Sequence, residues 1–346
     1  MSNRAERRGF ALPAVLAVTG VVTLVFLVAM TALASLNAEA GSARARVRFL
    51  QRAMTAEAAV AYLGATEPMS STGFAAGTSR SGEAFDGVAL ATDGNAVSLI
   101  SHVRLDGRPY NLKTPSDLIL ELQDQGGMIN LATLSDEQWR RLGERLGASP
   151  ALSGQMGARY RDYVDTDSLT GPGGAEQSAY DSGSPANRAL RRASEVLSVL
   201  GIRAATDKAQ WRSLRSELAT DSTRIFTNIN TAPAEALQIL FGLSARQAAA
   251  AIRVRETTPF TSLSDLAAAA GQAVNGDPES LYTFPTGSIV YSIRDKRSAW
   301  TYRGRLALTP TGLEQPVWID QTELTEAPRR AVANITDATD FPYAPR

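Results

Sequence analysis

Residues 10–36 read FALPAVLAVTGVVTLVFLVAMTALASL, an uncharged run of 27 residues. A helix needs about 20 apolar residues to cross the hydrocarbon core of a bilayer, so this run predicts one transmembrane helix. Arg4, Arg7 and Arg8 precede it, and basic residues beside a first helix stay on the cytoplasmic side. The chain that follows is therefore expected on the outer side of the membrane.

The helical pattern continues beyond the apolar run. Apolar residues recur at intervals of three and four, at Val47, Leu50, Met54, Ala58 and Ala61. This spacing predicts a single helix over residues 10–63, apolar in its first half and amphipathic in its second. A cleaved secretory signal with a small-residue site at Ala32 and Ala34 is the alternative, but its apolar region would be shorter than this run.

Composition excludes several classes of function. The 346 residues include 35 Lys plus Arg, 35 Asp plus Glu, no cysteine and one histidine, His102. The balanced charge gives no reason to expect a nucleic-acid partner. Without cysteine there are no thiolate metal sites, and one histidine leaves little material for a catalytic triad or a multi-histidine site. Because the sequence has no phosphate-binding loop and no nucleophile with a partner base, we predict that the chain is not an enzyme.

The chain after the helix changes its pattern three times. Residues 64–130 contain a loop rich in small residues up to residue 95 and then strand patterns, whereas 131–284 contain short helical patterns separated by turn residues. Strand patterns return in 285–326, and residues 327–346 are expected to be an irregular tail. The predicted fold class is α+β, with an antiparallel sheet that is interrupted by a mainly helical insertion.

Individual elements follow from the same patterns. Asp106-Gly107 predicts a hairpin turn within 97–112, and strands are expected over 118–124, 288–294, 300–308 and 315–323. Helices are expected over 135–147, 154–164, 188–200, 207–218, 232–241, 245–255 and 262–270.

The residues before the apolar run carry a resemblance. Arg7-Arg8-Gly9, followed by Phe10 and a long apolar helix, resembles the start of type IV pilins and pseudopilins. The resemblance implies that a prepilin peptidase removes residues 1–9 by cutting after Gly9 and methylates the amine of Phe10. It also implies a single-pass inner-membrane protein with a cytoplasmic N-terminus, its bulk in the periplasm and a pseudopilin-type sheet.

The fifth mature position departs from the common pattern of that family. Most members carry glutamate there, where the carboxylate neutralises the N-terminal ammonium of a neighbouring subunit in lipid. This chain has Ala14, so it is poorly suited to repeat along a filament. In this respect the chain resembles type II secretion system protein K, the family member that typically lacks the glutamate. Protein K is a large minor pseudopilin at the tip of the fibre.

The resemblance to protein K implies a function and a set of partners. We expect the chain to nucleate or cap a pseudopilus that exports folded proteins across the outer membrane. Other minor pseudopilins, the major pseudopilin, the prepilin peptidase and secreted proteins are the expected partners, and nucleic acid is not. A minor pilin of a type IV pilus and an envelope DNA-binding uptake protein are the alternatives.

An acidic, glycine-rich loop follows the predicted helix 154–164. Residues 162–176 read DYVDTDSLTGPGGAE, and Asp165, Asp167 and Glu176 match positions one, three and twelve of an EF-hand loop. Positions five and six, however, lack the ligand and the glycine that an EF-hand needs. From the residues alone, a calcium site and a solvated acidic loop both remain open.

The same loop resembles a protein K signature, an Asp-Trp-x-Asp-x-Asp element followed by Gly-Ala-Glu. The matching residues here are Asp162, Asp165, Asp167 and Gly174-Ala175-Glu176, with Tyr163 in place of the tryptophan. Members of the family bind calcium in their helical insertion. The resemblance therefore implies Ca²⁺ as a cofactor, held by Asp162, Asp165, Asp167 and Glu176.

A second motif lies in the insertion. Residues 228–232, NINTA, and the turn Gly242-Leu243-Ser244 resemble a helix-hairpin-helix unit of DNA-binding competence proteins. Such units hold phosphate with backbone N–H groups of a glycine-rich hairpin, but here the second glycine is missing. Arg246, Arg253 and Arg255 are the basic residues nearby. Packing within the insertion is therefore the favoured interpretation, with DNA contact as its alternative.

Overall fold

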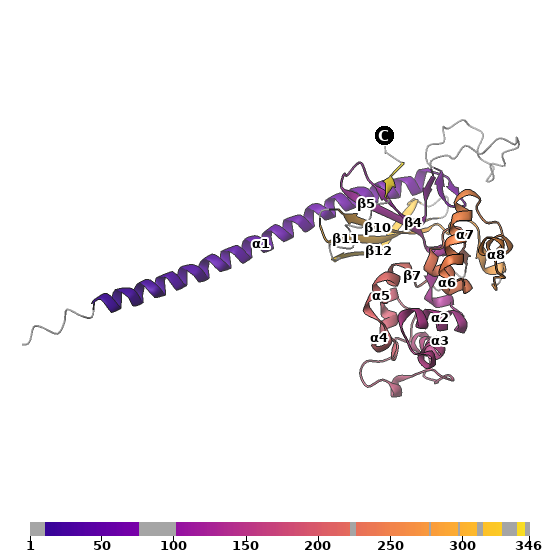
Figure 1. The fold of residues 1–346 in the computed structure, drawn as a ribbon, viewed down its shortest axis with the longest axis horizontal. Helices are drawn as coiled ribbons and strands as arrows, with labels where there is room; N and C mark the ends of the chain where they lie inside the picture. Colours follow the sequence, from indigo (N-terminus) through magenta and orange to yellow (C-terminus); the bar gives the residue numbers. More distant parts are fainter. Residues whose placement is uncertain are drawn as a thin grey trace, which may run out of the picture. The chain divides into compact units, whose positions relative to one another are not determined.

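The computed structural model describes residues 11–75, 102–221, 226–276, 278–296, 298–309, 314–326 and 338–342. The chain divides into two compact units, residues 1–54 and residues 55–346. The first helix, α1, begins in the first unit and ends in the second. The sheets and the remaining helices lie in the second unit (Figure 1).

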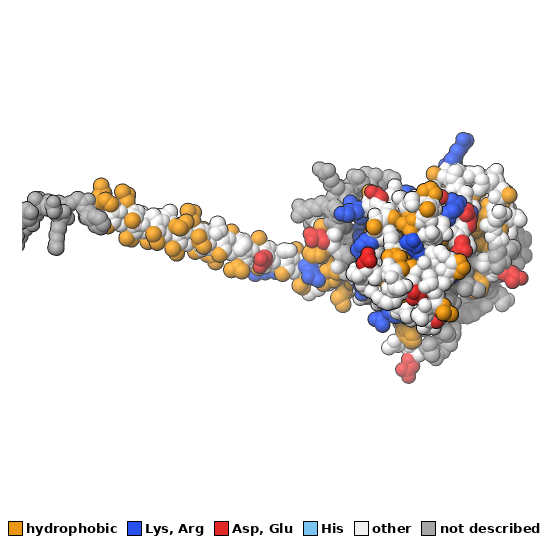
Figure 2. Space-filling view, turned by 90° about the horizontal axis from the view of Figure 1, so that it is seen from below, with side chains coloured by type: hydrophobic (Ala, Val, Ile, Leu, Met, Phe, Trp, Pro, Cys, Tyr) orange, Lys and Arg blue, Asp and Glu red, His pale blue; other side chains and the backbone are white. Residues whose placement is uncertain are grey.

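α1 (Ala11–Thr66) is one helix of 56 residues, which confirms the prediction of a single long helix. Over residues 12–36 its apolar side chains are exposed, for example Leu12 at 72% and Phe26 at 63%. Figure 2 shows this part of the helix as mostly hydrophobic and uncharged surface. Among the described residues it is the one helix long and apolar enough to cross a membrane, and it is compatible with a single-pass anchor.

A six-stranded sheet forms the centre of the second unit, in the order β12-β11-β10-β5-β4-β13. Its strands are β4 (Asp106–Asn111), β5 (Leu118–Asp124), β10 (Ser288–Asp295), β11 (Trp300–Leu308), β12 (Val317–Glu326) and β13 (Thr339–Asp340). All neighbours are antiparallel except β13, which runs parallel to β4. Because β5 pairs directly with β10, with Leu120 opposite Ile293, the sheet is interrupted by the intervening chain, as predicted.

One face of this sheet contacts the end of α1 that lies in the second unit. Side chains alternate between the two faces of a strand, and Tyr291 of β10 and Tyr302 of β11 share the face toward the helix. Both hydroxyls donate to the Glu57 carboxylate of α1, Tyr302 at 2.7 Å. A Cβ at Gly304 would collide with the Tyr291 ring, so the ring crosses β11 at a residue without a side chain.

Short helices fill the insertion between β5 and β10. They are α2 (Asp136–Leu146), α3 (Pro150–Val164), α4 (Ile202–Ala205), α5 (Lys208–Leu214), α6 (Ala234–Phe241), α7 (Ala245–Thr257) and α8 (Leu263–Ala270). α2 packs beside α3, and α7 beside α6 and α8 (Figure 1). Trp139, 1% exposed, lies in their shared core with its ring 4.7 Å from that of Tyr160.

Local signals explain where these helices begin and end. Ser135 caps α2 by accepting from the Gln138 backbone N–H at 3.3 Å, and Gln138 accepts in return from the Ser135 N–H at 2.9 Å. Gly147 ends α2 with φ 93°, a conformation that glycine adopts without steric cost. The same reciprocal cap opens α7 at Ser244 and α8 at Ser262.

Short strands and 3₁₀ turns complete the described fold. The strands are β1 (Met69–Ser70), β2 (Gly73–Ala75), β3 (His102–Arg104), β6 (Ile129–Asn130), β7 (Leu218–Ala219), β8 (Thr227–Asn228) and β9 (Leu281–Tyr282). The 3₁₀ turns are η1 (Gln125–Gly127), η2 (Leu131–Thr133), η3 (Gln177–Ala179), η4 (Ala193–Ser198), η5 (Arg215–Glu217) and η6 (Pro278–Ser280).

The predicted hairpin at Asp106-Gly107 is wrong. β3 pairs with β2 and β4 pairs with β5, so the strands on either side of the turn belong to different sheets. The Arg108 guanidinium binds the Asp106 carboxylate from Nε at 2.9 Å and Nη2 at 2.7 Å, which holds the turn in an irregular start of β4. Gly107, with φ 79°, lies where the register between β4 and β5 shifts.

Three further expectations differ from the structure. The predicted helix 188–200 is only the 3₁₀ turn η4, because the backbone is extended at Arg192 and again at Val199; the Glu195 carboxylate accepts from the Arg191 and Arg192 N–H groups and caps the start of this turn. The predicted loop after the helix contains β1 and β2, and residues 76–101 lie outside the described residues. The expected irregular tail contributes β13, where Phe341 packs against Tyr110 with ring centroids 5.6 Å apart.

Candidate metal centre

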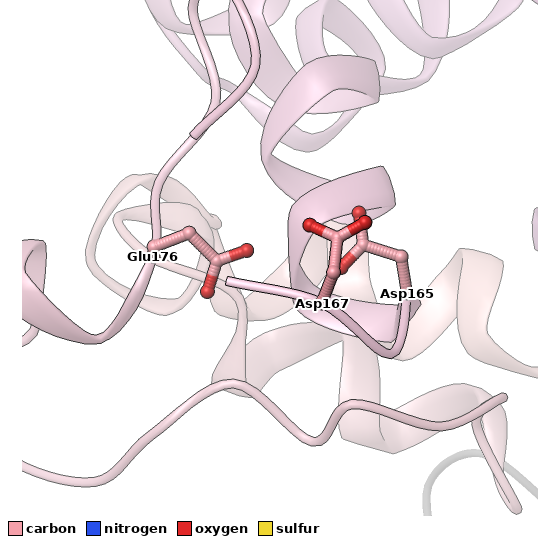
Figure 3. A group of neighbouring side chains, drawn as sticks. All are labelled: Asp165, Asp167 and Glu176. Atoms are coloured by element: carbon pink, nitrogen blue, oxygen red, sulfur yellow. The ribbon is translucent and has the colours of Figure 1, made fainter. Parts of the chain in front are cut away.

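Three acidic side chains from the predicted loop lie together in the structure. One carboxylate oxygen each from Asp165, Asp167 and Glu176 lies within 4.8 Å of the other two. Figure 3 shows Glu176 reaching from a separate segment toward the turn that carries both aspartates. The loop thus brings together positions that are eleven residues apart in the sequence.

The end of α3 and the glycine-rich loop build this arrangement. Asp165 is the first residue after α3, and its N–H still donates to the Arg161 carbonyl at 2.9 Å. Asp167 accepts from the Leu169 N–H at 2.8 Å, a side-chain turn that reverses the chain. Glu176 directly precedes η3 and is 5% exposed, so its carboxylate is held inside the loop.

Asp162, which was expected as a fourth ligand, has a different place. Its Oδ2 accepts from the Gly171 N–H at 3.1 Å, and it is 5% exposed. A Cβ on Gly174 would collide with this carboxylate, so glycine is required for the loop to fold around it. Asp162 is therefore not in the group of three; it binds the backbone of the loop that carries them.

The electrostatics of the group disfavour three bare charges. Burial, then the charges of Asp167 and Asp162, raises the pKa of Asp165, and burial followed by Asp165 and Asp162 raises the pKa of Glu176. Asp165 Oδ1 and Glu176 Oε1 are buried and have no hydrogen-bond partner among the described residues. A buried carboxylate oxygen without a donor is costly, so these two atoms are open to a cation.

The geometry of the group suits a calcium ion. Ca²⁺ binds oxygen at 2.3–2.6 Å, so two of its ligands lie at most about 5 Å apart, whereas Mg²⁺ brings them to within about 4.2 Å. Oxygens within 4.8 Å of one another already satisfy the limit for Ca²⁺. The three carboxylates could supply three of the six to eight oxygens, with backbone carbonyls and water completing the shell.

The polar side chains of the NINTA motif form their hydrogen bonds inside the protein. Asn230 donates from Nδ2 to the Phe260 carbonyl at 2.9 Å and to the Thr283 carbonyl at 3.1 Å, and its Oδ1 accepts from the Phe260 N–H at 2.8 Å. Asn228 and Thr231 donate to the buried Asp124 carboxylate, each at 2.9 Å. These side chains therefore join segments of the fold, which supports the packing interpretation of the motif.

The basic residues near the motif are also not gathered at the hairpin. Arg255 is 2% exposed and donates to the Ile229 carbonyl at 2.8 Å, whereas Arg246 and Arg253 are exposed on α7. Burial lowers the pKa of Arg255 to about 10, with the nearby Asp106 opposing that shift. Arg255 thus packs α7 against the motif and is not available to a phosphate at the hairpin.

Sequence reasoning missed Asp124, at the end of β5. Its carboxylate is fully buried and accepts five hydrogen bonds, from the Gly126 N–H, the Thr286 N–H and hydroxyl, the Asn228 amide and the Thr231 hydroxyl. The only signal in the sequence is Asp-Gln-Gly-Gly after an apolar strand, which also describes an ordinary turn.

The positions that define the N-terminal predictions lie at the start of the chain. Gly9 and Phe10 fall outside the described residues. Ala14 lies in the first turn of α1, which contains no acidic residue.

Comparison with known proteins agrees with the protein K resemblance. Two family models, both described as type II secretion system protein K, match residues 119–213 and 227–283. A chain in the crystal structure of the GspK-GspI-GspJ complex from the type 2 secretion system of enterotoxigenic Escherichia coli is 18% identical, with a TM-score of 0.45. That match covers 61% of this chain and 80% of the other. No curated protein sequence is a significant match.

The two matched segments divide the insertion between them. The first contains β5, Asp124 and the acidic triad, and the second contains the NINTA motif and α6 to α8. Members of the matched family are structural, non-enzymatic components of the secretion system. Residues 119–213 and 227–283 of the chain therefore match the type II secretion system protein K family, in agreement with the resemblance seen in the sequence.

Proposed function

We propose that this chain is a minor pseudopilin, which occupies the tip of a pseudopilus and nucleates or caps its assembly. Ala14 is the observation that carries the proposal, since the first turn of α1 has no carboxylate to neutralise the ammonium of a neighbour. A subunit that cannot make this contact in lipid suits a single terminal position. The other minor pseudopilins and the major pseudopilin are its proposed partners.

The membrane arrangement is part of the same proposal. The uncharged part of α1 spans the inner membrane, with Arg4, Arg7 and Arg8 on the cytoplasmic side. A prepilin peptidase cuts after Gly9 and methylates Phe10, which leaves a mature chain with the bulk of its residues in the periplasm.

Intact-mass analysis of the chain extracted from membranes tests the processing step. We expect a mature protein that begins at Phe10 with one added methyl group. A Gly9→Val variant should keep residues 1–9, because the peptidase no longer meets glycine at the cut. A mature N-terminus near Ser35 would instead show a secretory signal and contradict the pilin-type anchor.

Calcium at the acidic triad is the second part of the proposal. Asp165, Asp167 and Glu176 are the proposed ligands, and Asp162 shapes the loop around them. The buried oxygens of Asp165 and Glu176 that lack a donor support it. The ion would favour the charged forms, which burial and then mutual repulsion disfavour in Asp165 and Glu176, and would hold the loop against the end of α3.

Thermal melting of the full chain in detergent, with Ca²⁺ or with EDTA, tests the calcium proposal. A ligand that binds only the folded state at a hundredfold excess over Kd stabilises it by about 2.7 kcal/mol. We expect a higher Tm in Ca²⁺ than in EDTA, with Mg²⁺ a poor substitute. Asp167→Asn should remove most of that difference, because it keeps an oxygen for the Leu169 N–H but loses the charge.

Asp181→Asn is the matched control, since Asp181 is an exposed aspartate of the same insertion that lies outside the triad. This variant should keep the full response to Ca²⁺. If the unmodified chain melts at the same temperature in Ca²⁺ and in EDTA, the loop is a solvated acidic turn and the calcium proposal fails.

A further inference from the structure

A cleft of about 400 Å³ lies between the central sheet and the insertion. On the sheet side it is lined by alternate residues of β10, β11 and β12, among them Arg294, Arg303 and Arg305. These residues share the face opposite to the one that contacts Glu57, since Tyr291 and Tyr302 alternate with them. Residues of η4, α5, η5 and β7 form the other side.

Arginine dominates the charge of this cleft. The lining contains six arginines, Arg192, Arg212, Arg215, Arg294, Arg303 and Arg305, and a single acidic residue, Glu323. Because the whole chain has equal numbers of basic and acidic residues, this local excess is a feature of the cleft and not of the composition.

Three of the six arginines are balanced by carboxylates on the sheet. Arg294 pairs with Glu121 at 2.6 Å, and Arg305 pairs with Asp320 at 2.6 Å. Arg303 stands directly opposite Glu323 in the β11–β12 register, and its Nη2 donates to the Ser216 carbonyl at 2.8 Å. The sheet side of the cleft is therefore close to neutral.

The arginines on the insertion side form no ion pair with a described residue, although Asp207 at the start of α5 lies near enough for the charge of Arg212 to contribute to the lowering of its pKa, after the hydrogen bonds from the Gln210 and Ala209 N–H groups. Within the part of the chain that the structure describes, no carboxylate forms an ion pair with Arg192, Arg212 or Arg215, and all three are exposed. Burial lowers the pKa of Arg303; the charges of Glu323 and Glu121 oppose this shift, and the positive charges of Arg215 and Arg294 add to it. An anion in the cleft would relieve this repulsion.

We propose that the cleft binds an acidic segment of a partner protein, with carboxylates held by Arg212 and Arg215. The planar guanidinium fork matches a carboxylate in a bidentate pair, which lysine does not. The hydroxyl and amide groups of Ser292, Thr325 and Gln321 line the same space and suit a peptide backbone. One water molecule occupies about 30 Å³ of liquid, so a cleft of about 400 Å³ has room for much more than a single small anion.

This inference is independent of the tip position and of the calcium site. None of the triad residues lines the cleft, and its arginines lie at the start of η4, on α5 and η5 and on the sheet, not on α1. A failure of either earlier proposal therefore leaves this one standing, and the reverse also holds.

Binding of a fluorescein-labelled hexaglutamate peptide to the full chain in neutral detergent, followed by anisotropy, tests the proposal. The variant is the double change Arg212→Gln and Arg215→Gln, and the control is the double change Arg246→Gln and Arg253→Gln. All four arginines are exposed, and the control pair lies on α7, outside the cleft lining. Both variants lose the same charge, and their Tm values should match that of the unmodified chain.

We expect the cleft variant to bind the peptide about tenfold more weakly and the control variant to lose less than twofold, because two charge pairs each contribute up to about 1 kcal/mol. A hexaglutamine peptide should not bind. An equal loss in both variants would show general charge attraction and overturn the proposal. Complete competition by inorganic phosphate at the concentration of the peptide carboxylates would show a small-anion site and overturn it as well.

Discussion

Replacing Asp124 with alanine removes the acceptor for five donors at a fully buried site. A buried donor left without a partner costs about 1–3 kcal/mol, but water entry and local relaxation reduce the sum for neighbouring groups. We therefore expect Asp124→Ala to lower the free energy of unfolding by about 3–6 kcal/mol. This loss is a large fraction of the 5–15 kcal/mol that stabilises an ordinary domain.

Urea unfolding of the full chain in detergent, followed by tryptophan fluorescence, to which the buried Trp139 contributes, measures this effect. Asp136→Ala is the matched control, since Asp136 pairs with Arg161 at 2.6 Å on the surface and should contribute less than about 1 kcal/mol. Hydrogen exchange should also accelerate at Gly126 and Thr286, whose N–H groups lose their acceptor. If the two variants unfold at the same urea concentration, Asp124 does not join the sheet to the insertion as we have argued.

Two further predictions concern single charges. Burial, then the nearby Glu235, raises the pKa of Glu217 to about 7, so the folded state keeps a proton that the unfolded state loses above about pH 4.5. The free energy of unfolding should therefore fall between about pH 4.5 and 7, by roughly 1–3 kcal/mol at pH 7.5. Glu217→Gln should remove this loss, whereas the control Glu144→Gln on the surface should not. If melting temperature depends on pH in the same way in wild type and in Glu217→Gln, the prediction is wrong. At the start of α1, Ala14→Lys places a cation in lipid at a cost of up to about 3 kcal/mol and should reduce co-purification of the other minor pseudopilins, whereas Ala14→Glu should be tolerated. Crosslinks that show this chain repeated along the fibre shaft would refute the tip position.

Elements whose signals are local were predictable from the sequence. α2 is enclosed by a serine cap and a C-terminal glycine, so its bounds follow from residues within one turn of its ends. β5 and β11 agree with the predicted strands, since apolar and polar residues alternate along most of β11 and from Leu120 to Gln123 of β5. α1 was predictable for the simplest reason, since a long uncharged run has few alternatives to a helix.

Features that depend on distant partners were not predictable. β13 exists because Phe341 reaches Tyr110 and the Phe341 N–H donates to the Asn111 carbonyl at 2.9 Å, contacts that span more than 200 residues. Asp106-Gly107 has the composition of a hairpin turn, but Arg108 and the pairing of β4 with β5 determine its conformation. In both cases tertiary contacts override the local preference.

Two buried acidic sites in this chain show why a carboxylate pattern alone does not identify a metal site. Asp124 and Glu176 are both almost fully buried, yet Asp124 accepts five hydrogen bonds whereas the buried Oε1 of Glu176 accepts none from the described residues. A carboxylate whose oxygens all accept hydrogen bonds has no lone pair left for a cation. Asp124 therefore has a structural role, in which its hydrogen bonds connect the sheet to the insertion. The triad has the opposite balance, with three carboxylates, mutual repulsion and open oxygens. This contrast supports calcium at the loop more directly than the spacing of its acidic residues does, because it depends on which donors the folded chain supplies.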